Sequence, residues 1–128
     1  MAQIKVYGRR SAWADRRGEL SDLLHASLRA AWRLPDGKRF HRFLLLDDGD
    51  LVAPMRGDRY LIVEILCFTG RSDEAKRGLV RDLYARLVPA LALDPADLEI
   101  TIVDVPPVNW GIRGVPADEL SLDYPVEL

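Results

Sequence analysis

Apolar residues along the first half of the chain change from alternating to helical spacing and back, which predicts a strand–helix–strand unit. Ile4 and Val6 lie on one face of a strand predicted over residues 3–7. A helix follows, because the next apolar residues recur at helical spacing: Leu20, Leu23, Leu24, Leu28 and Ala31. Residues 35–37, Pro-Asp-Gly, end this helix, and residues 39–46 return as a second strand.

The second half repeats this order with stronger signals. Residues 60–68 form a near-continuous apolar run, which is typical of a strand covered on both faces or within an oligomer. Ser72 is a predicted N-cap, and the helix behind it carries one apolar stripe: Leu79, Val80, Leu83, Leu87 and Leu91. Pro89 is expected to kink or shorten this helix. A last strand is predicted where apolar and polar residues alternate, with Leu98, Ile100 and Ile102 on one face.

Both halves therefore run strand, glycine, arginine, helix, proline turn and strand, which indicates an internal duplication. We predict one domain over residues 1–128, with repeat units over about 2–46 and 60–105, a linker over 47–58 and a C-terminal arm over 106–128. The expected fold class is α+β (α/β): a four-stranded sheet with two helices on one face, followed by a turn and a terminal strand in the arm. Within each unit the strands should be parallel, with a right-handed crossover.

Composition places this chain among ordered globular proteins and removes several classes of partner. Its 128 residues are 48% hydrophobic and 30% charged, which suits one two-layer core. The 18 basic and 20 acidic residues are interspersed, so we expect neither nucleic acid nor membrane as a partner. Cys67 is the single cysteine, which excludes an internal disulfide framework and a cysteine-based zinc site. The opening MAQIKVYGRR has no apolar secretion signal, so a cytoplasmic protein is expected.

Two motifs in the second half resemble the tautomerase superfamily. Residues 70–76, GRSDEAK, are similar to the opening of the helix in 4-oxalocrotonate tautomerase-like proteins. Residues 109–114, NWGIRG, resemble the aromatic-Gly-Ile-x-Gly segment that ends the same β-α-β unit in that family. The double-unit length is similar to that of the malonate semialdehyde decarboxylase branch, whose members are trimers. The resemblance therefore implies a tautomerase (MIF-like) fold and a homotrimer. An apolar open sheet face and two unpaired sheet edges, as this fold would leave, also favour a homotrimer.

The resemblance implies a keto-enol tautomerase, or a related decarboxylase or hydratase, that acts on a small carboxylate-bearing molecule without a metal or organic cofactor. The family's base is the secondary amine of an N-terminal proline, and the residue after Met1 here is Ala2. If Met1 is removed, Ala2 supplies a primary amine with a reference pKa of about 7.7 to 8.0, which can still act as a base. Ala2 is therefore the candidate catalytic residue of this isomerase. With Met1 retained, the family mechanism is not expected.

The resemblance also supplies candidate substrate-binding residues. The family's arginines bind a carboxylate through two parallel hydrogen bonds, and the arginine that opens the helix falls on Arg71. Its pocket aromatic falls on Trp110, and a further arginine falls on Arg56, with Arg39 as the other candidate to hold the carboxylate. Arg71 as an exposed residue at a strand–helix junction and Arg56 as a solvated linker charge are the alternatives. Trp110 is also open to a second interpretation, as a packed interface residue.

Two departures from the family pattern keep a second function open. A second family arginine aligns with Glu99, and an acidic residue of the decarboxylase branch aligns with Lys38. The alternative function is a catalytically silent oligomeric binding protein on the same scaffold.

Other chemistry-bearing residues favour structural interpretations. Cys67, inside an apolar strand, is expected to be an inert thiol. His25 has no ligand partner at metal-binding spacing, and residues 39–42 are better explained by a half-buried strand than by a nucleic-acid surface. The acidic residues in 47–50 lack a second cluster for calcium and are interpreted as a turn.

Overall fold

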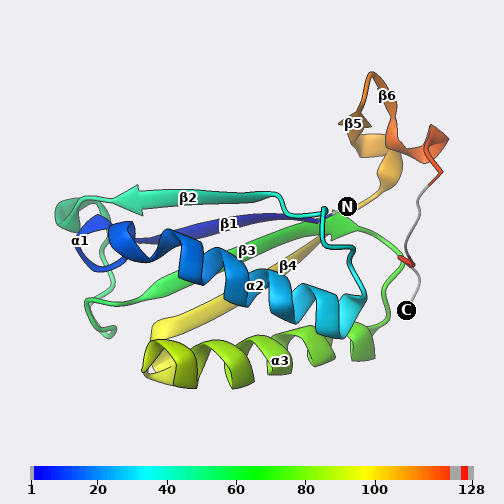
Figure 1. Ribbon diagram of the computed structural model, residues 1–128. Coiled ribbons are helices and arrows are strands. Elements are labelled where there is room, and N and C mark those ends of the chain that lie inside the picture. The colour runs from blue at the N-terminus through cyan, green and yellow to red at the C-terminus, as the bar shows by residue number, and fades with distance from the viewer. Residues whose placement is uncertain (1, 122–124, 127–128) are drawn as a thin grey trace.

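The computed structural model describes residues 2–121 and 125–126, and its centre is one mixed four-stranded sheet. The strands are β1 (Ala2–Arg9), β2 (His41–Leu46), β3 (Leu61–Phe68) and β4 (Leu98–Val105), in the order β2-β1-β3-β4 (Figure 1). β1 and β2 are parallel, as are β3 and β4, while the two units join through antiparallel β1 and β3. The predicted pair of β-α-β units and their parallel strands are confirmed, and the first strand of each unit lies centrally.

The helices cover a single face of this sheet, as predicted (Figure 1). The first unit carries α1 (Arg10–Trp13), a 3-10 turn (Ala14–Arg16) and α2 (Arg17–Trp32). The second carries α3 (Asp73–Leu91), whose N-cap is Ser72, as expected. The Ser72 hydroxyl accepts a hydrogen bond from the Ala75 backbone N–H at 3.1 Å, which satisfies one of the free donors of the first turn.

Pro89 lies inside α3 and does not end it, while a kink at Pro89, the other expectation, stays a prediction. The helix continues to Leu91, and Ala92 then ends it with a left-handed backbone, φ 49°. Leu87 and Leu91, on either side of the proline, are both fully buried. Their burial in the core holds the last turn in helical form, because it outweighs the loss of one backbone hydrogen bond.

The core lies between the sheet and the two long helices. Every second residue of β1 and β3 points toward the helices, which is the alternation expected of a sheet with one covered face. These side chains pack against the apolar stripes of α2 and α3. The fully buried members include Ile4, Val6, Leu24, Leu28, Leu61, Val63, Ile65, Leu79, Leu83 and Leu87.

The open face of the sheet mixes polar and apolar side chains, which corrects the expectation that this face would be apolar. Strand alternation places Lys5, Arg42 and Glu64 there, beside one another in the sheet register. Leu44 and Val103, on β2 and β4, are 38% and 41% exposed. The face therefore offers apolar contacts bordered by charges of both signs.

The segments outside the sheet are short turns. Asp48–Asp50 form a 3-10 turn, so the acidic linker residues are a turn, as interpreted. The arm contains a small hairpin, β5 (Gly111–Ile112) and β6 (Val115–Pro116), and a 3-10 turn at Ala117–Glu119. The terminal strand predicted behind the hairpin falls partly on residues 122–124 and 127–128, outside the described residues. Among the helices of the described chain, none combines the length and apolar character that a bilayer crossing requires.

Candidate active site

Ala2 begins β1 at one end of the sheet, where the N-terminus is marked in Figure 1. It pairs with Cys67 near the end of β3, and its side chain is 3% exposed. Antiparallel pairing of β1 with β3 brings the start of the first strand beside the end of the third. The candidate base and the turn that leads into α3 therefore share one end of the sheet.

Arg71 lies in that turn, and its side chain points into the protein. The residue is 5% exposed, so the alternative that Arg71 is an exposed junction residue is wrong. Its Nη1 donates to the Phe68 carbonyl at 3.5 Å, and its guanidinium carbon lies 4.1 Å from the centre of the Trp32 ring. Nε and Nη2 have no hydrogen-bond partner in the described part of the chain.

A buried guanidinium with two free donors is an unusual electrostatic arrangement. Burial lowers the pKa of Arg71, whereas the nearby Cys67 and Asp104 act in the opposite direction. Arginine nevertheless stays protonated in proteins, so the side chain remains a cation in a poorly solvated place. An unpaired buried charge costs several kcal/mol, and an anion bound to the free N–H groups would offset that cost. The geometry is thus suited to a carboxylate.

A carboxylate of the chain lies near Arg71 but is engaged with another cation. Asp104 Oδ2 accepts from Lys76 Nζ at 2.5 Å, and Asp104 Oδ1 lies 3.6 Å from the Cys67 sulfur. Desolvation by burial raises the pKa of the Cys67 thiol to about 11. Cys67 is therefore a neutral thiol at physiological pH, in agreement with the inert role predicted for it, and Asp104 is largely committed to Lys76.

Trp110 reaches the same end of the sheet from the opposite side. Its ring packs edge-to-face on Phe68, with centroids 5.0 Å apart at 72°. Because Phe68 follows Cys67 in the strand, its side chain points away from the helices, toward the side on which the arm lies (Figure 1). Trp110 and Arg71 therefore flank this end of the sheet rather than touch each other.

A cavity of about 290 Å³ opens beneath the arm beside Trp110 and Phe68. Its lining residues come from the end of β3 and from the arm: Phe68, Thr69, Pro107, Ala117, Asp118, Leu120 and Val126.

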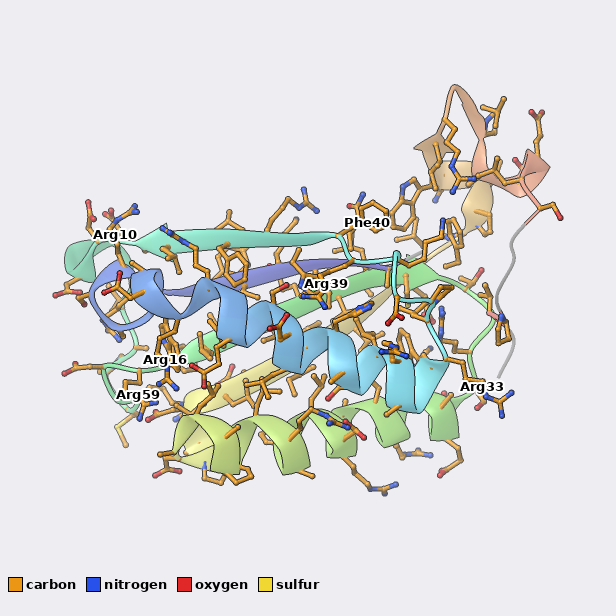
Figure 2. All side chains as sticks on the ribbon, in the orientation of Figure 1. Arg10, Arg16, Arg33, Arg39, Phe40 and Arg59 are labelled. Carbon is orange, nitrogen blue, oxygen red and sulfur yellow. The ribbon has the colours of Figure 1, made fainter. Side chains whose placement is uncertain are left out.

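The other two predicted arginines lie elsewhere in the chain. Arg39 lies beside α2 (Figure 2) and pairs with Asp22 at 2.5 Å. Arg56 lies near the opposite end of the sheet, where it pairs with Glu99 at 3.1 Å. Ala2, Arg71 and Trp110 are thus gathered at one end, and a carboxylate-binding role for Arg39 or Arg56 stays a prediction that requires a neighbouring subunit.

Sequence reasoning missed the residues that surround Arg71. Trp32 extends the apolar stripe of its helix four residues beyond Leu28, a spacing that signals burial but names no partner. Lys76 and Asp104 carry no motif that links them. Trp32 reaches Arg71 through the packing of one unit against the other, and Asp104 comes from the strand that follows α3, so both contacts depend on tertiary packing that local patterns do not encode.

The chain belongs to the tautomerase family, because the family described as tautomerase enzyme matches residues 38–113, more than half of its length. It is similar to the 2-hydroxymuconate tautomerase of Comamonas testosteroni, 40% identical over 58 residues, which cover 45% of this chain and 92% of the relative. The enzyme of the same name from Pseudomonas putida is 35% identical over 58 residues, with the same coverage. These matches span about one unit, in agreement with a duplicated chain.

Solved structures show the same fold at low identity. Native fused 4-OT superposes with a TM-score of 0.82 at 20% identity, over 92% of this chain and 98% of the other. The FG41 malonate semialdehyde decarboxylase inhibited by 3-bromopropiolate gives 0.79 at 21% identity, over 94% of this chain and 98% of that chain. The double β-α-β fold of this chain is therefore shared with native fused 4-OT and with this decarboxylase.

Proposed function

We propose that this protein is a keto-enol tautomerase that acts on a small carboxylate-bearing substrate, with the amine of Ala2 as the base once Met1 is removed. The buried guanidinium of Arg71, with Nε and Nη2 unpartnered beside the end of β3, is the observation that carries this proposal. The relatives named 2-hydroxymuconate tautomerase support the reaction type and a carboxylate-bearing substrate.

The proposed chemistry moves one proton within the substrate. The neutral amine of Ala2 takes the proton from the enol hydroxyl, and the resulting ammonium returns it to the carbon that becomes the keto form's α-carbon. Arg71 binds the substrate carboxylate through two N–H groups and stabilises the negative charge that spreads onto the enolate. A guanidinium near the amine also favours the neutral amine, which is the form that acts as a base. Trp110 and Phe68 would supply an apolar wall against water.

A homotrimer is part of the proposal. A structurally similar protein, the R7 fused 4-OT, is an asymmetric trimer, and the open sheet face here carries exposed Leu44 and Val103. Assembly over this face would cover those side chains and allow Arg39 or Arg56 of a neighbouring subunit to complete the site. Light scattering of the purified protein at micromolar concentration should give the mass of three chains, and a monomer would exclude this assembly.

The catalytically silent binding protein is the second candidate, and the residue at the position of the family's proline favours it. Ala2 offers a primary amine, whereas the family reaction depends on the secondary amine of an N-terminal proline. Intact mass spectrometry of untagged protein first establishes whether Met1 is removed. Tautomerisation of phenylenolpyruvate and of 2-hydroxymuconate then separates the two candidates, because the silent protein would bind these compounds without accelerating the reaction.

Substitution of the base tests the proposal directly. We expect weak activity in the natural protein and a gain on the order of 10²-fold in Ala2→Pro, because a secondary amine in an apolar, cationic site is the better base. Arg71→Gln should abolish the gain, whereas Arg77→Gln, on the exposed face of α3 and paired with Glu74, should keep it. A folded Ala2→Pro protein, free of Met1 and inactive, would favour the silent binding protein.

A further inference from the structure

We propose that Trp32 is a positioning residue that aims Arg71 at the substrate carboxylate. This inference rests on the proposed function and assigns a role to a residue of the first unit's helix. The guanidinium carbon of Arg71 lies 4.1 Å from the centre of the Trp32 ring, a distance typical of a stacked cation–π pair. The site of one unit is thus oriented by a side chain of the other.

The Trp32 ring is itself held in place. It is fully buried at the C-terminal end of α2, and its Nε1–H donates to the Ala75 carbonyl at 2.9 Å. Ala75 lies in the first turn of α3, four residues after Arg71. A ring anchored to the first turn of α3, which begins two residues after Arg71, offers a fixed platform, so stacking on it sets the plane of the guanidinium.

The stacked orientation leaves a defined edge of the guanidinium for a ligand. A carboxylate binds in the guanidinium plane, either to the two terminal nitrogens or side-on to Nε and one terminal nitrogen. Nε and Nη2 of Arg71 are both buried and both unpartnered among the described residues, and Nη1 is directed to the Phe68 carbonyl. The nitrogens left for a carboxylate are therefore Nε and Nη2, which form the side-on pair of the guanidinium. The Cys67 thiol close by is a weak acceptor and does not replace a carboxylate.

A second tryptophan in the chain shows what purely structural stacking looks like. Trp13 is also fully buried, with Arg16 and Arg59 at 5.4 and 5.3 Å from its ring. Both arginines have partners: Arg16 binds Glu19 through two nitrogens, and Arg59 donates to the Leu91 and Ala92 carbonyls at the end of α3.

Figure 2 shows Arg16 and Arg59 near the end of the molecule opposite the N-terminus of Figure 1. Trp13 is therefore the matched control for Trp32, since it is equally buried and also stacks with arginine but lies far from Ala2.

The test measures carboxylate binding and stability together in Trp32→Phe, Trp32→Leu and the control Trp13→Leu. Isothermal titration with phenylpyruvate, and kinetics where activity is present, should show Trp32→Leu weakened on the order of 10-fold in Kd and KM, with kcat changed less. Trp32→Phe should recover most of the affinity, because a phenyl ring still offers a face to the cation. Trp13→Leu should lose thermal stability and keep wild-type affinity.

A double-mutant cycle with Arg71→Gln separates positioning from general loosening of the fold. In the Arg71→Gln background, Trp32→Phe and Trp32→Leu should weaken binding no further, because the group they orient is gone. Additive losses in the cycle would overturn the inference, as would wild-type affinity in Trp32→Leu or an equal loss in Trp13→Leu. If Trp32→Leu does not fold, Trp32→Phe carries the same comparison. If the wild-type protein binds no phenylpyruvate, the proposed carboxylate site fails first and the role of Trp32 fails with it.

Discussion

Acidification is expected to destabilise this fold through two histidines packed between α2 and β2. His25 is 2% exposed, and its ring centre lies 6.3 Å from that of His41. Nδ1 of His41 shares a hydrogen bond with the Ser21 hydroxyl at 2.8 Å. Burial lowers the pKa of both rings, that of His41 from 6.5 to about 4.

The charged groups around this pair act in both directions. Arg39 lowers the pKa of both histidines, Arg29 lowers that of His25, and Asp36 partly opposes the shift at His25. His25 also lowers the pKa of His41. Burial is the larger cause of the lowered pKa at both rings, and the Arg39 and Arg29 guanidinium groups, which stay charged over the whole range, add to it.

Acid destabilises the folded protein because the pKa of His41 is lower in the folded state than in the unfolded chain. In the unfolded chain His41 takes up a proton near pH 6.5, whereas in the folded protein it stays neutral until about pH 4. The unfolded state therefore binds more protons in this window, so stability is complete above pH 6.5 and falls as the pH approaches 4. The full difference would correspond to roughly 3 kcal/mol, and partial access of water to the ring reduces it to about 1–2 kcal/mol.

Urea unfolding followed by circular dichroism at pH 7 and pH 5 measures this loss. Between pH 7 and pH 5, the free energy of unfolding of the wild-type protein should fall by about 1 kcal/mol more than that of His41→Gln, because glutamine does not titrate. His41→Gln keeps a side-chain amide that can bond to Ser21, so it serves as a polar control for the packing. An NMR titration that places the pKa of His41 above 6 would refute the reasoning, as would identical pH dependence in the two proteins.

Two further predictions concern packing and thiol reactivity. Gly8→Ala should destabilise the protein by about 1–3 kcal/mol in urea unfolding, because an added Cβ would lie 2.8 Å from Trp13 Cδ1 and 3.1 Å from Leu61 Cδ2; an unchanged midpoint and slope would contradict this close packing. Cys67, buried and with its pKa raised to about 11, should resist iodoacetamide at pH 8 in native protein and react after unfolding in urea. Fast modification of the folded protein, monitored by mass spectrometry, would show that this strand end opens.

Much of the fold could be predicted from the sequence because local patterns determine it. Alternation along β1 and β3 and the helical stripes of α2 and α3 predicted the two units, and Ser72 correctly marked the start of α3. The helix continues past Pro89 because the tertiary burial of Leu87 and Leu91 competes with the local tendency of proline to end a helix. The open face of the sheet was expected to be apolar, but it carries both polar and apolar side chains. Alternation along a strand shows which residues share a face and does not show what those residues contact.

The candidate site could be predicted only in part. The resemblance at residues 70–76 placed Arg71 correctly in the turn before α3, but the burial of its side chain depends on Trp32, which lies 39 positions earlier in the sequence. Arg56 was assigned by the same resemblance, and the structure shows it paired with Glu99 near the far end of the sheet. Such distances follow from strand order and helix packing, which sequence motifs do not specify.

Antiparallel pairing of β1 with β3 relates the two units by an approximate twofold axis, so each end of the sheet begins one unit and ends the other. In the unfused ancestor that this duplication implies, both ends would be chemically equivalent. In this chain they have separated: Arg9 and Arg59 at the far end donate to backbone carbonyls, whereas Arg71 keeps two donors free of partners in the described chain. Because one chain carries both units, the two ends of its sheet need not be identical, and here the arginines of one end are satisfied by carbonyls while the guanidinium of the other has two nitrogens without a partner in the described residues.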